Sequence, residues 1–183
     1  MKKNILFTII LVASFILCSC GFFDADTPEL DDVITYAEDN QDELVSASLF
    51  LLDNYAEESD SINISKNTSG MYRKYSYRDE TAEEVELSEL NSLFDDKMVK
   101  LITLRSNAVE YSVGSAGIGS NNTYFKLIYI PSGKVEDLFG FSEAYHMHYD
   151  KSTGGFCGEK EGSDNTYFYY RINDNLYYVI AHY

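Results

Sequence analysis

Apolar and polar residues recur with helical spacing in the stretch that begins near residue 28. Thr27-Pro28-Glu29 opens this stretch with a capping hydroxyl, a proline at the first helical position and an acid in the first turn. An apolar stripe follows at intervals of three and four residues, with acidic side chains on the opposite face. Its members are Leu30, Val33, Ile34, Ala37, Leu44, Val45, Leu49, Leu52 and Tyr55. The pattern predicts one long helix from about residue 28 to about residue 58, which can bend near Asn40.

The pattern becomes less regular after this helix. Ile62 and Ile64 alternate with polar residues, and residues 59–79 are compatible with two short strands or with a loop. A second, shorter helix is predicted within about residues 83–96, with Ser88 as its cap.

Strand patterns dominate the rest of the chain. Apolar residues alternate on both sides of a turn within residues 99–113, which predicts a β-hairpin, with a helix continuing to Leu104 as the alternative. Two aromatic strands are predicted over residues 167–172 and 176–182, joined by the turn at residues 173–175. Both strands carry bulky residues on both faces, which is typical of covered strands in the middle of a sheet.

One short sequence occurs twice. Gly119–Phe125 and Gly162–Phe168 are identical at six of seven positions. Each copy combines Gly and Asn turn residues with the start of an aromatic strand. Because the flanking residues differ, we interpret the repeat as the same hairpin chemistry used twice, rather than as a duplicated unit or a pair of ligand loops.

Together these elements predict an α+β fold. A long N-terminal helix and a shorter helix would pack on a mostly antiparallel sheet of about five to seven strands. Residues 28–183 are long enough for a single domain with its own core.

The N-terminal residues follow a different pattern. Lys2 and Lys3 precede an apolar run over residues 5–17, which has the length of a signal peptide and is shorter than the about 20 residues needed to span a membrane. The run ends in Leu17-Cys18-Ser19-Cys20, with an aliphatic residue three places before Cys20 and a small residue directly before it. These residues resemble the lipobox of bacterial lipoproteins.

The resemblance implies a lipid anchor. Residues 1–19 would be a signal peptide removed before Cys20, the Cys20 thiol would carry diacylglycerol, and residues 20–27 would be a short lipidated tether. Cys18 fits less well because bulky Leu17 precedes it. An ordinary signal peptide and an uncleaved signal anchor are the alternatives. The expected location is extracytoplasmic, on the cell membrane or the outer membrane.

Composition limits the partners. Hydrophobic residues make up 45% of the chain and aromatic residues 15%, with only two prolines, so a packed domain is expected rather than a disordered chain. The net charge is −16 and becomes −18 once Lys2 and Lys3 are removed. Such a charge repels nucleic acid, and it repels anionic lipid headgroups, so the lipid on Cys20 would have to hold the protein at the membrane. The charge either keeps the domain soluble or attracts cationic partners or divalent ions.

Candidate chemistry is sparse. In a strand, His146 and His148 would point to the same side, together with Asp150, which makes them weak candidates for metal ligands. A zinc site needs three or four ligands, and His182 is the only other histidine. The G-x-S-x-G, G-x-G-x-x-G, H-E-x-x-H and P-loop motifs are absent, and no cofactor is expected. After processing, Cys157 is the only remaining thiol, so no disulfide can form within the chain.

Tyrosine content favours binding over catalysis. The chain has 16 tyrosines and no tryptophan. Tyrosine gives rigid contact area with a polar tip, which suits protein or peptide recognition, although many of these rings are expected in the core. We therefore expect a membrane-anchored, non-enzymatic binding domain with an envelope or extracellular protein partner. A surface enzyme that uses His146, His148 and nearby acids is the alternative.

Overall fold

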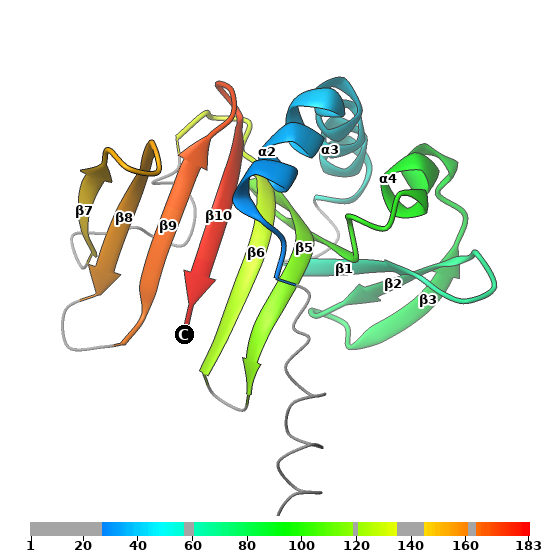
Figure 1. The fold of residues 1–183 in the computed structure, drawn as a ribbon. Helices are drawn as coiled ribbons and strands as arrows, with labels where there is room; N and C mark the ends of the chain where they lie inside the picture. Colours follow the sequence, from blue (N-terminus) through cyan, green and yellow to red (C-terminus); the bar gives the residue numbers. More distant parts are fainter. Residues whose placement is uncertain (1–26, 57–60, 119–120, 135–144, 161–163) are drawn as a thin grey trace, which may run out of the picture.

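The structure is a computed structural model that describes residues 27–56, 61–118, 121–134, 145–160 and 164–183. Ten strands form one sheet in the order β3-β2-β1-β4-β5-β6-β10-β9-β8-β7 (Figure 1). All of the pairs are antiparallel. The strands are β1 (Ser61–Lys66), β2 (Tyr72–Ser76), β3 (Thr81–Val85), β4 (Leu101–Arg105), β5 (Ala108–Ile118), β6 (Asn121–Tyr129), β7 (Tyr145–Asp150), β8 (Gly155–Lys160), β9 (Thr166–Arg171) and β10 (Leu176–His182).

The helices are short. They are α2 (Leu30–Asp39), α3 (Gln41–Tyr55) and α4 (Asn91–Asp95), with the 3-10 helix η1 (Ser88–Leu90) directly before α4. Asn40 separates α2 from α3: its backbone N–H and its side-chain amide both donate to the carbonyl of Tyr36, at 3.0 and 2.8 Å. These bonds end α2, and the chain changes direction before α3 begins.

The expected α+β fold with a long N-terminal helix is therefore wrong. The described chain is mainly a ten-stranded antiparallel sheet, and its first helical region is broken at Asn40. Within residues 59–79, where two short strands or a loop were expected, the structure has the two strands β1 and β2. The second helix expected within about residues 83–96 is wrong in extent, because β3 occupies the start of this stretch and α4 is only five residues long.

The main core lies between the helices and one face of the sheet. Helix α3 packs across β4, β5 and β6, with Leu44 and Leu51 fully buried. Tyr111 of β5 reaches up to this helix, where its hydroxyl donates to the carbonyl of Leu44 at 2.9 Å and shares a 2.6 Å hydrogen bond with Ser48. The hairpin predicted within residues 99–113 is confirmed, since β4 and β5 pair from Leu101 to Arg105.

The opposite face of the sheet has a second, smaller apolar cluster. Its buried members are Ala108, Ile128, Ile130, Tyr177 and Val179. Glu110 lies beside this cluster at 1% exposure, in ion pairs with Arg105 and Lys126, the latter at 2.6 Å. A buried carboxylate needs such partners, because desolvation strongly disfavours an isolated charge.

The repeated sequence leads into β6 and β9, which lie on either side of β10. Equivalent residues of the two copies pair with the same residue of β10: Thr123 and Thr166 with His182, Tyr124 and Tyr167 with Ala181, and Phe125 and Phe168 with Ile180. The two copies of the repeat therefore pair with β10 in the same register, one on each side of this strand.

Candidate functional site

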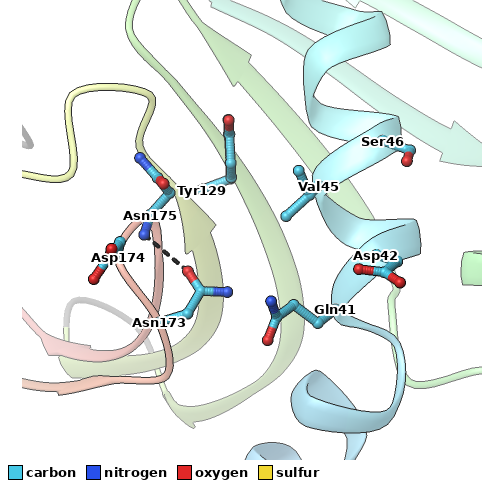
Figure 2. Close-up of a pocket in the computed structure, with 8 residues that line it drawn as sticks. All are labelled: Gln41, Asp42, Val45, Ser46, Tyr129, Asn173, Asp174 and Asn175. Atoms are coloured by element: carbon cyan, nitrogen blue, oxygen red, sulfur yellow. Dashed lines mark hydrogen bonds between the residues drawn. The ribbon is translucent and has the colours of Figure 1, made fainter.

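A cavity lies between the start of α3 and the turn that joins β9 to β10. It has a volume of 620 Å³ (Figure 2). Helix α3 contributes Gln41, Asp42, Val45 and Ser46, whereas the sheet contributes Tyr129, Asn173, Asp174 and Asn175. We call this cavity the α3–turn cleft. The cleft begins directly after Asn40, the residue that separates α2 from α3.

The side chain of Asn173 shapes the β9–β10 turn. Its Oδ1 accepts hydrogen bonds from the backbone N–H groups of Asn175 and Leu176, both at 2.8 Å. This is the local bonding by which asparagine stabilises turns. Because the carbonyl oxygen is used by the turn, the amide nitrogen is left as the group that Asn173 can offer, and Figure 2 shows Asn173 and Gln41 facing one another across the cleft.

The side chain of Asn175 is held through its amide nitrogen, whereas that of Asn173 is held through its oxygen. Its Nδ2 donates to the carbonyls of Ile130 and Pro131, at 2.9 and 3.0 Å. The chain turns tightly after this point at Gly133, whose φ of 65° favours glycine and where a side chain would meet the carbonyl of Asp174. The Oδ1 of Asn175 is thus the atom available as an acceptor, and its orientation is set before any ligand arrives.

Tyr129 adds a buried phenol to the cleft. The residue is 6% exposed and rises from β6 between Asn175 and Val45 (Figure 2). The buried side-chain polar atom that lacks a hydrogen-bond partner among the described residues is the hydroxyl of Tyr36, and not that of Tyr129. Tyr129 therefore contributes to the cleft as part of its lining, and its hydroxyl needs no bound group to satisfy it.

A second cavity of 350 Å³ adjoins the cleft. It is lined by residues 38–43 at the α2–α3 junction, so the two cavities share Gln41 and Asp42. We call it the acidic cavity. Burial, and secondarily the negative charge of Asp96, raise the pKa of the Glu43 carboxyl above its ordinary value. Four of the six residues that line this cavity are acidic, and they are Glu38, Asp39, Asp42 and Glu43.

The cleft offers binding groups rather than a catalytic set. Its lining presents amides, carboxylates, a hydroxyl and a phenol, and includes no His, Cys or Lys within the described residues. Of its two carboxylates, Asp174 is engaged by Arg171 at 2.6 Å. A nucleophile with an adjacent base, the usual arrangement for covalent catalysis, is not present in this lining.

The proposed metal ligands are not gathered into a site. His148 lies on β7 and is exposed, and the backbone of His146 pairs with Glu159, while its side chain lies outside the described part. His182 lies three strands away from β7, about 14 Å at the usual strand spacing, so it cannot share an ion with this pair. Among the described residues, no group of three or more His, Cys, Asp or Glu side chains could hold a metal ion.

Asp150, the acid proposed to assist the histidines, has a local structural role. Its carboxylate accepts bonds from the backbone N–H of Ser152 at 2.9 Å and from the hydroxyls of Ser152 and Thr153. The bonds from Ser152 hold the pKa of this carboxyl below its ordinary value. In the β7–β8 turn, the Asp150 carboxylate thus uses for hydrogen bonds the lone pairs that a metal ion would need.

Cysteine chemistry is also not supported at Cys157. The thiol is half-buried, and burial, followed by the charge of Asp150, raises its pKa above the ordinary value. A raised pKa reduces the thiolate fraction and so the reactivity of the residue. The other candidate, Cys20, lies outside the described residues, and none of the described helices is long and apolar enough to cross a membrane.

Comparisons with known proteins add no assignment: no family model matches the chain, and neither does any curated protein or solved structure.

Sequence reasoning missed the α3–turn cleft. Residues 173–175 were interpreted only as a turn, and Gln41 and Asp42 only as the polar face of a helix. The available signal was the run Asn173-Asp174-Asn175, which has more hydrogen-bonding side chains than a short turn requires. Nothing in the sequence showed that this run lies opposite α3.

Proposed function

We propose that this protein is a lipid-anchored extracytoplasmic domain that binds a ligand in the α3–turn cleft without chemically changing it. The observation that carries the binding function is the cavity itself, which has a volume of about 620 Å³ and is lined by hydrogen-bonding side chains at every position except Val45. Asn173 and Asn175 support it, because hydrogen bonds to the backbone already fix the orientation of both amides. Groups fixed before binding reduce the entropy lost on association.

The anchoring part of the proposal rests on the N-terminal sequence. Leu17-Cys18-Ser19-Cys20 resembles a lipobox, and the acidic chain has no electrostatic means of holding an anionic membrane. A diacylglycerol group supplies two acyl chains, which is enough for stable attachment. The short tether that follows Cys20 would then keep the cleft close to the membrane surface.

The anchor is tested by replacing Cys20 with Ser in the full chain. We expect Cys20→Ser to lose radiolabelled fatty acid and to move from the membrane pellet to the soluble fraction or to accumulate as the uncleaved precursor. Cys18→Ser is the matched control, and should keep both the label and the attachment. A Cys20→Ser protein that still carries labelled lipid, or a Cys18→Ser protein that loses it, would show that the anchor is assigned wrongly.

A further inference from the structure

The face of the sheet that lies away from the helices carries five exposed aromatic rings. Six large apolar side chains are exposed in the described chain, and Leu49 of α3 is the only one of them on a helix. The other five are aromatic and lie on the side of the sheet opposite the main core. We call this side the aromatic face, and its exposed rings belong to Tyr77, Tyr124, Tyr149, Phe156 and Tyr183.

Strand pairing places the first group of rings on this face. Tyr149 of β7 pairs with Phe156 of β8, and Phe156 pairs with Tyr169 of β9. Residues directly opposite one another in antiparallel strands share a face, and Tyr169 packs against the second apolar cluster, which lies away from the helices. The rings form a row, with centroids 5.3 Å apart for Tyr149 and Phe156 and 5.0 Å apart for Phe156 and Tyr169.

Two further groups lie along the same face. Tyr124 alternates with Phe125 of the main core, so its ring points to the aromatic face, where it contacts the ring of Tyr183 at 5.9 Å. The Tyr77 hydroxyl accepts a 2.9 Å hydrogen bond from Asn63, whose position in β1 lies between two buried residues of the main core. The exposed rings are therefore spread from the end of β2 to β7. Exposed apolar surface of this kind is typical of contact with a protein or a membrane.

Charge is distributed unequally between the two sides of the domain. Residues 27–56, which include α2 and α3, contain eight acidic residues and no Lys or Arg. In the described chain, the strand positions of the aromatic face have four basic and two acidic side chains. The basic ones are Arg73, Arg105, Lys126 and Arg171, and the acidic ones are Glu84 and Glu110. The helical side is therefore strongly acidic, whereas the aromatic face is not.

An anionic bilayer distinguishes these two sides. Tyrosine is enriched where proteins meet the membrane–water interface, because its ring is apolar and its hydroxyl is polar. The negative surface potential of the bilayer repels carboxylates within a Debye length, which is about 8 Å at physiological ionic strength. When the aromatic face contacts the membrane, the acids of α2 and α3 lie on the far side of the sheet, so this orientation minimises their repulsion.

The predicted tether would keep the domain at the bilayer surface. Thr27 follows Cys20 by seven residues, which reach at most about 25 Å when fully extended. The net charge of the domain does not attract it to anionic lipid, so the lipid on Cys20 supplies the attachment. The uneven distribution of the charge then determines which side of the domain faces the membrane.

We propose that the aromatic face lies against the anionic bilayer to which Cys20 anchors the chain, with its exposed rings at the level of the headgroups. Helices α2 and α3 then face away from the membrane, which leaves the α3–turn cleft accessible. This inference rests on the lipid anchor of the proposed function, and it adds the surface that contacts the membrane.

The experiment uses single tryptophans as probes, because the chain has no tryptophan of its own. Tyr149→Trp places the probe on the aromatic face, and the matched control Leu49→Trp places it on α3, where the replaced side chains are 54% and 45% exposed. The full acylated chain is reconstituted into vesicles of phosphatidylcholine and phosphatidylglycerol, with lipids brominated near the headgroup as quencher. Tyr149→Trp should lose at least about twice the fraction of emission that Leu49→Trp loses, because its ring lies at the interface.

A second probe tests the other end of the aromatic face. Tyr77→Trp should be quenched as strongly as Tyr149→Trp, because both rings would lie at the headgroups. Quenching of Tyr149→Trp alone would overturn contact through the whole face. All three variants replace exposed side chains and should unfold at the wild-type temperature in detergent, which shows that each probe reports on the folded domain.

Vesicle flotation separates this inference from the anchor. A chain that does not float with the vesicles has no anchor, which overturns both proposals. If the chain floats but Tyr149→Trp is quenched no more than Leu49→Trp, the anchor stands and the orientation is wrong. The Tyr149→Trp chain in detergent is also mixed with dextran sulfate. If this soluble polymer shifts the emission while brominated lipid does not quench it, the aromatic face binds an anionic polymer and the bilayer is overturned as its partner.

Discussion

The two copies of the repeated sequence have the same register but opposite burial. Phe125 on β6 is 7% exposed beneath the helices, whereas Phe168 on β9 is half-buried against Gly155 of β8. The tyrosines that precede them show the reverse order, with Tyr124 at 37% exposure and Tyr167 at 5%. The same residues paired with the same strand thus have different surroundings.

The difference teaches that strand pairing and burial are set by different parts of this fold. Hydrogen bonding to β10 places both copies, but α2 and α3 cover the β6 side of the sheet and no described helix lies over β9 in Figure 1. Tyr183 contacts both copies from beyond the end of β10, with ring centroids 5.9 Å from Tyr124 and 5.8 Å from Tyr167. Equivalent substitutions in the two copies should therefore have unequal effects.

The phenylalanines should give the largest contrast. Phe125→Ala is expected to lower the free energy of unfolding by about 3–5 kcal/mol, because it leaves a cavity in the main core. Phe168→Ala should cost about half as much, because part of its ring already contacts solvent. Urea unfolding of the full chain in detergent measures both. Equal losses would mean that β9 is covered as completely as β6.

The tyrosines should reverse this order. Tyr167→Ala is expected to cost about 3 kcal/mol and Tyr124→Ala about 1 kcal/mol, following their burial. Removing Tyr183 should reduce the difference, because its ring contacts both tyrosines. Thermal unfolding of the three variants checks the order, and a larger loss from Tyr124→Ala than from Tyr167→Ala would contradict the burial argument.

Local features could be predicted from the sequence, and non-local features could not. The hairpin formed by β4 and β5 is confirmed because its turn and its alternation lie in adjacent residues. The repeat was visible, but its placement around β10 depends on pairings between distant strands. The long helix failed at Asn40, whose side chain can either continue a helix or cap one.

The site was harder to predict than the fold. The α3–turn cleft lies between the start of α3 and the β9–β10 turn. The periodicity of apolar residues along a chain does not show which distant segments lie close together. The pair His146 and His148 was a reasonable candidate, because alternate residues of a strand share a face. Among the described residues no third ligand lies near this pair, because two strands separate His182 from β7.

The threonines of the repeat should give the smallest contrast. Thr123 Oγ1 and His182 Nδ1 share a hydrogen bond of 2.9 Å, whereas Thr166, on the other side of His182, has no such bond in the described chain. Replacing a threonine with the similarly shaped valine removes the hydroxyl and keeps the volume. Thr123→Val should therefore cost about 1 kcal/mol, the net value of one hydrogen bond, and Thr166→Val close to nothing. Hydrogen exchange of the His182 amide and urea unfolding measure the difference. Equal losses of stability in the two variants would contradict this prediction. They would mean that the two threonines bond equally to His182.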